Sequence, residues 1–419
     1  MKVKILLSLI VLIFSLIIGA QSYNIDNLIH QVSKIRELTL KRKIRYQFAT
    51  KKEILKYIEK KISTHYTPQK LLNEEIILKD LELIPSNFNY LKATYKLLEE
   101  QVAGIYAPEL KKLYIAKWLD LSTQYIILVH EITHALQDQN FNLGQLLNSS
   151  NFTDKQLAIS SLVEGDAMAV TFKYALKELG FDFTAIPYSL IDSLLNQFLI
   201  SHPTDTIATV PRYLRDTLIF PYKYGLEFVR QLYIKGGWKS INKAFNKVPE
   251  STEEIIHIDK YLKRDFIRID PNIFPKKFSS FQKVYNDIFG EYNIYQYLLQ
   301  YTNNEYISSK GAEGWRGDLI VLYYMNKDPN TRILFHLIRW DTKKDKDEYI
   351  NIMYNSIFKT HDKLNCYLNL QCRIIILPDD KNFRAILEIN NTTTLYIVKA
   401  PINYYSEIEK LISQVISRL

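Results

Sequence analysis

The chain is poor in cysteine, with Cys366 and Cys372 as the only two among 419 residues. Neither lies near the N-terminus, which argues against a lipoprotein anchor. Neither has a histidine neighbour at the spacing of a metal or catalytic site. In an exported protein the pair could form a short-loop disulfide, or it could remain as two free thiols.

The sequence also lacks a dense basic run, a zinc-finger spacing and an aromatic–basic RNA-binding motif. Its formal net charge is +9, which can indicate a nucleic-acid partner or an anionic membrane surface. Because the lysines are spread along the whole chain, we interpret this charge as solvated surface and expect no nucleic-acid partner. Hydrophobic residues make up 47% and charged residues 24%, as in a globular protein.

Only one long apolar run is present, from Ile5 to Ile18, and it follows two lysines. A basic start, a short apolar stretch and small residues after it describe a secretory signal. The run is shorter than the roughly 20 residues of a membrane span, but an uncleaved anchor stays open because Ile18 is large for a cleavage site. We expect residues 1–20 to be a signal peptide or N-terminal anchor and the rest to be secreted or extracytoplasmic. Any membrane contact would be through that segment if it is uncleaved.

The remaining sequence predicts an α+β protein that is mainly helical up to about residue 275. Apolar residues recur at helical spacing over 23–80, 89–102, 123–139, 153–180, 186–200 and 221–234. Two prolines, Pro271 and Pro275, mark a boundary between domains 21–275 and 276–419. Beyond it we predict antiparallel strands at 319–324, 332–340, 371–377, 382–389 and 394–399, and helices at 344–358 and 405–418.

His130, Glu131 and His134 form the pattern His-Glu-x-x-His within the predicted helix 123–139. Residues four apart lie one turn apart and roughly 40° around the helix, so both imidazoles can hold one zinc ion. Glu131 lies beside them, where its carboxylate can accept a proton from a water that attacks a carbonyl. Because this helix is apolar on nearly all sides at its start, burying these side chains without partners would be costly. Two unrelated surface histidines are therefore disfavoured.

Glu164 is the candidate for the third protein ligand that a catalytic zinc requires. It lies 30 residues after His134 in a predicted helix. Small residues on that helix would let it pack closely against the motif helix: Ala158, Ser161, Gly165 and Ala169. The alternative is an ordinary surface glutamate, since the helix also carries several lysines. Asp166 points elsewhere, and we expect it in a structural ion pair.

Two supporting roles have more than one candidate. Asp138 falls one turn after His134, where a carboxylate could orient an imidazole or simply be a charge at the helix end. Hydrolysis builds negative charge on the carbonyl oxygen, which a histidine, tyrosine or arginine usually helps to hold. His257 is the first candidate for that role and Tyr222 the second. The alternatives are a structural histidine and a packing tyrosine, since the chain has 30 tyrosines.

The motif helix followed by a glutamate on a second helix resembles the gluzincin, or thermolysin-class, zinc peptidases. The run 128–139 resembles more closely a group of exported microbial proteins of that class. Similar segments recur from about residue 80 to 341: 100–106, 220–225, 236–238, 251–261, 314–318 and 340–341.

The resemblance implies a zincin-like catalytic domain over 21–275 with a short edge sheet. It also implies that strand 113–118 is the edge strand that binds an extended substrate, through Leu113, Tyr114 and Ile115, although a purely structural strand is the alternative. The chain departs from the thermolysin class at Met168, where those enzymes carry an aspartate that steadies a zinc histidine. Asp138 could take over that function.

These observations predict a zinc metallopeptidase that hydrolyses peptide bonds in a peptide or protein substrate. One zinc per chain would be held by His130, His134 and Glu164, with Glu131 as the general base. A zinc-containing extracellular binding protein without turnover is the alternative, and the intact Glu131 argues against it. A structural zinc in a basic surface-binding module is disfavoured, because no cysteine lies near to fill its fourth position.

Overall fold

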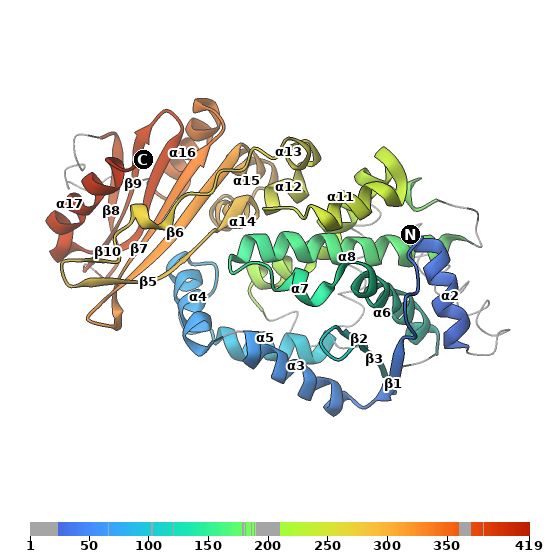
Figure 1. Cartoon of the computed structure of the whole chain (residues 1–419). Coiled ribbons are helices and arrows are strands. Elements are labelled where there is room, and N and C mark those ends of the chain that lie inside the picture. The colour runs from blue at the N-terminus through green and yellow to red at the C-terminus, as the bar shows by residue number, and fades with distance from the viewer. Residues whose placement is uncertain are drawn as a thin grey trace.

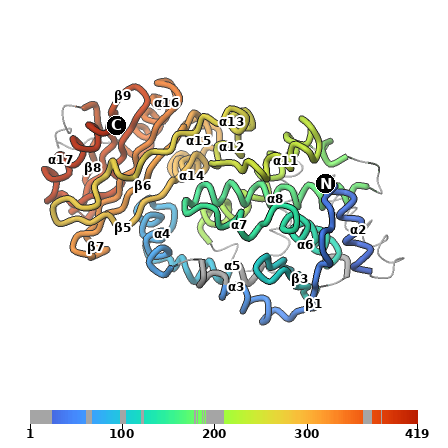
Figure 2. The backbone as a smooth tube through the Cα atoms, viewed as in Figure 1, coloured from blue at the N-terminus to red at the C-terminus, as the bar shows by residue number. Residues whose placement is uncertain are grey.

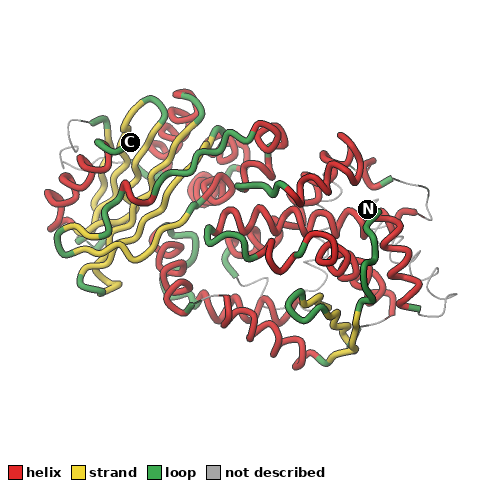
Figure 3. The backbone as a smooth tube through the Cα atoms, in the orientation of Figure 1, coloured by secondary structure: helices red, strands yellow, loops and turns green. Residues whose placement is uncertain are grey.

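The computed structural model describes residues 24–65, 67–101, 104–119, 121–177, 210–359, 370–379 and 381–419, with residues 180, 182–185, 187 and 189 between them. These residues form an α+β protein, as predicted. A mainly helical part carries a small three-stranded sheet, and a second part is built on a seven-stranded antiparallel sheet (Figure 1). Most strands gather at one end of the molecule (Figure 3).

The helical part contains the motif helix and its neighbours. The helix expected at 186–200 lies outside the described residues. The region 23–80 is mostly helical as expected, but it also contains strand β1. The elements are α2 (Ile25–Arg36), β1 (Arg45–Ala49), α3 (Lys51–His65), α4 (Pro68–Asp80), α5 (Tyr90–Gln101), β2 (Gly104–Ala107), β3 (Lys112–Ala116), α6 (Leu121–Phe141), α7 (Leu143–Leu147), α8 (Thr153–Leu176), α11 (Arg212–Asn246), α12 (Thr252–Ile256) and α13 (Ile258–Lys263).

The small sheet has β3 at its centre. β1 runs parallel to β3, with Arg45 opposite Lys112, and β2 runs antiparallel to it, with Gly104 opposite Ile115. The resemblance implied that 113–118 is an edge strand, but both edges of β3 are hydrogen-bonded to neighbours. That expectation is wrong because strand order depends on β1 and β2, which the hydrophobic pattern did not reveal.

The long helices α6, α8 and α11 share one buried core in the helical part. α8 and α11 cross where two glycines meet: a Cβ on Gly165 would lie 2.1 Å from the carbonyl oxygen of Gly225. A Cβ on Gly225 would lie 2.1 Å from the carbonyl oxygen of Ser161. The small residues expected to face the motif helix therefore face α11 at Ser161 and Gly165, since only glycine allows backbones to approach so closely.

The second part is a sheet of order β4-β5-β6-β7-β10-β9-β8, in which all neighbours are antiparallel. Side chains alternate between its faces, one packed with α14, α15 and α16 and the other with α17. The strands and helices predicted beyond residue 275 are confirmed, although β6 and β7 begin earlier than expected and β4, β5, α14 and α15 were not predicted. The elements are β4 (Lys277–Phe278), β5 (Phe281–Asp287), α14 (Gly290–Thr302), α15 (Glu305–Ala312), β6 (Trp315–Met325), β7 (Asp328–Trp340), α16 (Lys343–Ser356), β8 (Cys372–Ile376), β9 (Asn382–Asn390), β10 (Thr393–Pro401) and α17 (Tyr405–Ile416).

Helix α4 joins the two parts. Its apolar residues belong to the same buried cluster as β6, α14 and α16. Asp80 at its end pairs with Arg332 of β7 at 2.6 Å. The boundary expected near residue 275 coincides with the start of β4, but α4 lies before that boundary and packs beyond it. The division into domains 21–275 and 276–419 therefore stays a prediction.

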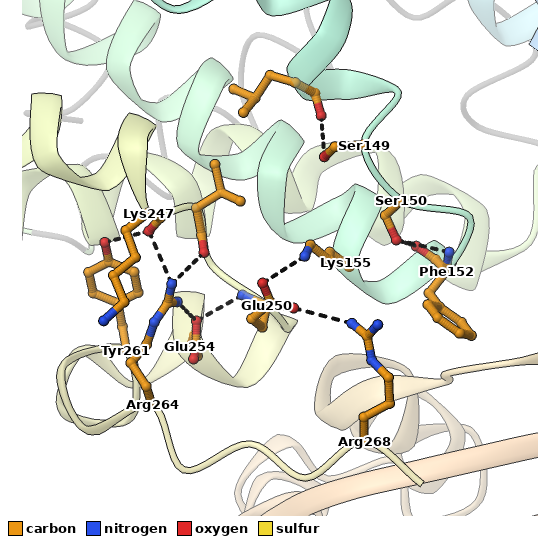
Figure 4. Close-up of polar contacts among 12 residues, drawn as sticks. Ser149, Ser150, Phe152, Lys155, Lys247, Glu250, Glu254, Tyr261, Arg264 and Arg268 are labelled. Carbon is orange, nitrogen blue, oxygen red and sulfur yellow. Dashed lines mark hydrogen bonds and ion pairs between the residues drawn. The ribbon is translucent and has the colours of Figure 1, made fainter. Parts of the chain in front are cut away.

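Ion pairs tie α8 to the segment that leads from α11 toward the large sheet (Figure 4). Glu250 accepts a hydrogen bond from Lys155 of α8 at 2.6 Å and pairs with Arg268 at 3.3 Å. Arg264 pairs with Glu254 of α12 at 2.5 Å. The start of α8 is thus held by the segment between α11 and the large sheet, while its middle reaches the motif helix.

Figure 2 traces the described backbone from α2 in the helical part to α17 beside the large sheet. Cys372, at the start of β8, is disulfide-bonded, whereas Cys366 lies outside the described residues. Residues 1–20, which we expected to be a signal peptide or anchor, also lie outside them. Within the described part of the chain, no helix is both long enough and apolar enough to cross a membrane.

Candidate metal centre

Two histidines of α6 and a glutamate of α8 come together in the helical part. The Nε2 atoms of His130 and His134 lie 3.1 Å apart. The Oε2 atom of Glu164 lies 3.0 Å from Nε2 of His130 and 3.5 Å from Nε2 of His134. Among the described residues, this is the only group of three or more metal-ligating side chains whose donor atoms all lie within 4.8 Å of one another.

The helical spacing of the motif brings the two imidazoles together on one turn of α6. Their rings meet edge to face, with centroids 4.6 Å apart. The side chains of His130, His134 and Glu164 are 16%, 11% and 23% exposed. The cluster is therefore supported from the core and remains open to solvent on one side. Buried apolar neighbours on the same helix support it: Val129, Ile132 and Ala135.

Glu164 and His134 stabilise each other as an ion pair. Burial opposes the charge of His134, but the Glu164 carboxylate outweighs burial and raises the pKa of His134 to about 9. Burial also opposes the charge of Glu164, but His134 and His130 lower the pKa of this carboxyl well below its ordinary value. Glu164 is therefore ionised at neutral pH, as a carboxylate ligand of a metal must be.

Glu131 lies against strand β2. Its Oε2 atom accepts a hydrogen bond from the backbone N–H of Tyr106 at 2.6 Å. A Cβ on Gly104 would lie 3.6 Å from Cγ of Glu131 and 2.9 Å from the side chain of Ile127, so β2 approaches α6 closely here. The charge of Glu131 also contributes to the raised pKa of His134. Glu131 is thus near the cluster without belonging to it, and the sequence analysis missed its backbone partner.

Tyr222 of α11 lies beside the cluster. Its ring centroid is 6.3 Å from that of His130. The Glu164 carboxylate and burial raise the pKa of Tyr222 well above its ordinary value, and Glu131 adds to the effect. The hydroxyl therefore stays protonated at neutral pH and can donate a hydrogen bond to an anionic oxygen.

His257 has a different set of partners. Its Nε2 atom lies 2.8 Å from Oε1 of Glu291, on α14. Burial opposes protonation of His257, but the hydrogen bond and charge of Glu291 raise its pKa, with smaller contributions from Glu313 and Asp259. None of these carboxylates belongs to the candidate metal cluster. On these contacts we take Tyr222 as the first candidate for the supporting role and His257 as the second.

Asp138 does not orient an imidazole. Its carboxylate accepts hydrogen bonds from the hydroxyl of Tyr106 and from Nζ of Lys111, each at 2.8 Å. The side chain that meets Nδ1 of His134 is Gln137, whose Oε1 lies 2.8 Å away. Of the two alternatives for Asp138, the one in which it orients an imidazole is contradicted, because residues around the small sheet bond its carboxylate. Sequence spacing does not locate that sheet. Gln137, three residues after His134, lies on the same helix face and could have been proposed.

The residues predicted to bind substrate belong to the centre of the small sheet. Leu113 and Ile115 are 0% and 3% exposed and form part of the core beneath α6. The ring of Tyr114 packs against that of Tyr57, with centroids 6.0 Å apart. Because the backbone of β3 is paired on both sides, it offers no edge to a substrate. The edge strand that contacts Glu131 is β2.

The donor set of the cluster suits zinc. Two imidazole nitrogens and one carboxylate oxygen are the protein ligands of many catalytic zinc sites, whereas calcium and magnesium prefer oxygen alone. Three protein ligands with one open side leave a position for a water or a substrate atom. The three residues could therefore hold one zinc ion in the manner of a catalytic site.

Comparison with known proteins concerns the second part of the chain. A family model described as a domain of unknown function, DUF8575, matches residues 278–405, from β4 to the start of α17. None of the three candidate metal ligands lies in this range. No curated protein and no solved structure matches the chain.

Proposed function

We propose that the chain is a zinc-dependent peptidase of the gluzincin type, with one zinc ion held by His130, His134 and Glu164. The observation that carries the proposal is the convergence of three donor atoms within 4.8 Å of one another. Further support comes from the His-Glu-x-x-His spacing and from Glu131, a carboxylate beside the cluster that does not belong to it.

The chemistry divides among a few residues. A zinc ion bound there would supply Lewis acidity, which polarises a carbonyl and makes water acidic near neutral pH. Glu131 accepts the proton of the attacking water and passes it to the leaving amine. The backbone N–H of Tyr106 holds the Glu131 carboxylate in place. Tyr222 donates a hydrogen bond to the oxygen on which negative charge develops.

The substrate that we propose is an extended peptide, bound along β2. Within the described residues, β2 pairs only with β3, so its other edge is where a further strand could pair. The N–H of Tyr106 is already bonded to Glu131, so the added strand would use the remaining backbone groups of that edge. A peptide backbone added there would run past the general base, and pairing through the main chain would give affinity without demanding one sequence.

The decisive experiment combines metal analysis with digestion of a peptide library, using the purified chain without residues 1–20. We expect about one zinc per chain, and cleavage that a chelator abolishes and added zinc restores. A protein that contains no zinc after purification and takes up none when zinc is added would refute the metal site. Zinc binding without any cleavage would support the alternative of an extracellular binding protein.

We also propose that the protein acts outside the cytoplasmic membrane. The support is the basic and apolar segment 1–20, since the described residues contain no other segment that suggests targeting. Fractionation of the native host should recover the protein in the extracytoplasmic or secreted fraction, anchored only if the segment is retained. Recovery in the cytoplasm with Met1 intact would contradict this proposal.

A further inference from the structure

A chain of buried hydrogen bonds leads from His134 to α2. Nδ1 of His134 lies 2.8 Å from Oε1 of Gln137. The amide nitrogen of Gln137 donates to Oδ2 of Asp166 at 2.8 Å and to the carbonyl of Val163 at 3.0 Å. Oδ1 of Asp166 accepts a hydrogen bond from Nε of Arg36 at 2.6 Å, which confirms the expected ion pair.

The partners of Gln137 determine which way its amide points. Both hydrogens of the amide nitrogen are used, one by the carboxylate of Asp166 and one by the carbonyl of Val163. The reversed amide would place its oxygen against these two acceptors and lose both hydrogen bonds. The amide oxygen of Gln137 therefore faces His134.

Arg36 keeps Asp166 in place as an acceptor. Both side chains are 0% exposed, so water does not reach the pair. Because a guanidinium is always charged, Arg36 needs the Asp166 carboxylate as its partner. Arg36 is itself held, because its Nη2 donates to Oδ1 of Asn242 at 2.9 Å and its guanidinium lies 4.5 Å from the ring centre of Trp238. Removing either partner would leave an uncompensated buried charge, so loss of this ion pair would be costly.

An amide oxygen only accepts hydrogen bonds, so Nδ1 of His134 must carry a proton. In the neutral imidazole, the form that binds a metal, the lone pair is then on Nε2, the atom that faces His130 and Glu164. We propose that Arg36, Asp166 and Gln137 are positioning residues that fix this tautomer and aim Nε2 of His134 at the metal ion. The inference rests on the proposed function and identifies the residues that orient its second imidazole.

Helix α8 carries both the proposed third ligand and one member of this series of hydrogen bonds. Glu164 and Asp166 are two residues apart on α8, so one placement of α8 beside α6 sets both the third ligand and the orientation of His134. An ion pair with a purely structural purpose would affect the free energy of unfolding alone. It would leave the zinc affinity of the folded protein unchanged.

The first test uses the unaltered protein. In the zinc-loaded chain with ¹⁵N-labelled histidine, we expect His134 to show a protonated Nδ1 and a metal-coordinated Nε2. Coordination through Nδ1 would overturn the inference. Because no substitution is involved, this result does not depend on whether a variant folds.

The second test measures zinc affinity by competition with a chelator. Gln137→Leu and Asp166→Asn should each bind zinc about 10–100-fold more weakly, the usual effect of losing an outer partner of a metal-binding histidine. Gln139→Leu is the matched control, since Gln139 lies on the same helix and bonds only the backbone of residues 41–42. It should keep the wild-type affinity.

The outcomes separate this inference from the proposed function. If the wild type binds zinc and the folded Gln137→Leu and Asp166→Asn proteins bind it equally well, the positioning chain is refuted while the metal site stands. If the wild type itself binds no zinc, the proposed function fails and the positioning role fails with it. Thermal unfolding of each variant establishes that it is folded before its affinity is compared.

Discussion

Glu131 is the residue whose replacement distinguishes an enzyme from a zinc-binding protein. Glutamine keeps the size of the side chain and can still accept the N–H of Tyr106, but it cannot take a proton from water. Glu131→Gln should fold and bind one zinc per chain, while turnover falls by about 10²–10⁴-fold, the usual effect of removing a general base. Peptide hydrolysis and metal content measure the two effects. Wild-type turnover in this variant would place the activity elsewhere.

Tyr222 is the residue we expect to stabilise the developing negative charge. Its protonated hydroxyl and its place beside His130 suit that role, whereas His257 is bonded to Glu291. Tyr222→Phe should lower kcat by about 10²–10³-fold with little change in zinc content.

His257→Ala is the comparison for Tyr222→Phe, since the sequence analysis gave His257 the same role. We expect its kcat to stay close to that of the wild type under conditions in which the variant is folded. A large loss of kcat at His257 and none at Tyr222 would restore the order suggested by the sequence.

At the scale of elements, the crossing of α8 and α11 determines where Glu164 lies. A methyl group at Gly165 would lie 2.1 Å from a backbone oxygen of α11, and a backbone cannot yield as a flexible side chain can. Gly165→Ala should therefore destabilise the fold by about 1–3 kcal/mol and weaken zinc binding, because Glu164 is the adjacent residue. Thermal unfolding and chelator competition measure the two effects.

Gly144→Ala is the matched control for this crossing. Gly144 lies in the short helix α7, where an added Cβ would have its nearest neighbour at an ordinary 3.8 Å. This substitution should be neutral or stabilise the protein by up to about 1 kcal/mol, since alanine favours a helix over glycine. Equal effects of the two substitutions would show that the close approach of α8 and α11 is unimportant.

At the scale of the whole molecule, His257 links the helical part to α14 and should make stability depend on pH. The pKa of His257 is raised in the folded protein, mainly by Glu291 against the effect of burial. The stabilisation is therefore complete below the unfolded value of about 6.5 and is lost as pH rises through the higher folded value. The melting temperature of the wild type should exceed that of His257→Gln at pH 6, and the difference should shrink toward pH 9.

His30→Gln provides the control for this pH dependence. His30 lies exposed on α2, so its replacement should shift the melting temperature little at any pH. A constant difference between the wild type and His257→Gln across the pH range would show that the ion pair with Glu291 does not contribute as we expect.

The sequence by itself determined the features that depend on local periodicity. His130 and His134 meet because four residues make about one turn of α6, and strands β6 to β10 of the large sheet follow from the pattern of apolar residues. Glu164 was within reach of the same reasoning, since a catalytic zinc needs a third ligand and the helix of Glu164 was already predicted. These inferences require only the geometry of single elements and the known preferences of a metal.

Tertiary structure alone decided which elements are neighbours. It put β3 at the centre of its sheet, tied Asp138 to Lys111, and set the small residues of α8 against α11. It also brought Arg36 of α2 within 2.6 Å of Asp166, 130 residues along the chain. The physical reason is that strand order and helix crossings result from the packing of the whole core, in which each contact depends on many distant residues. No spacing within one helix or strand contains that information.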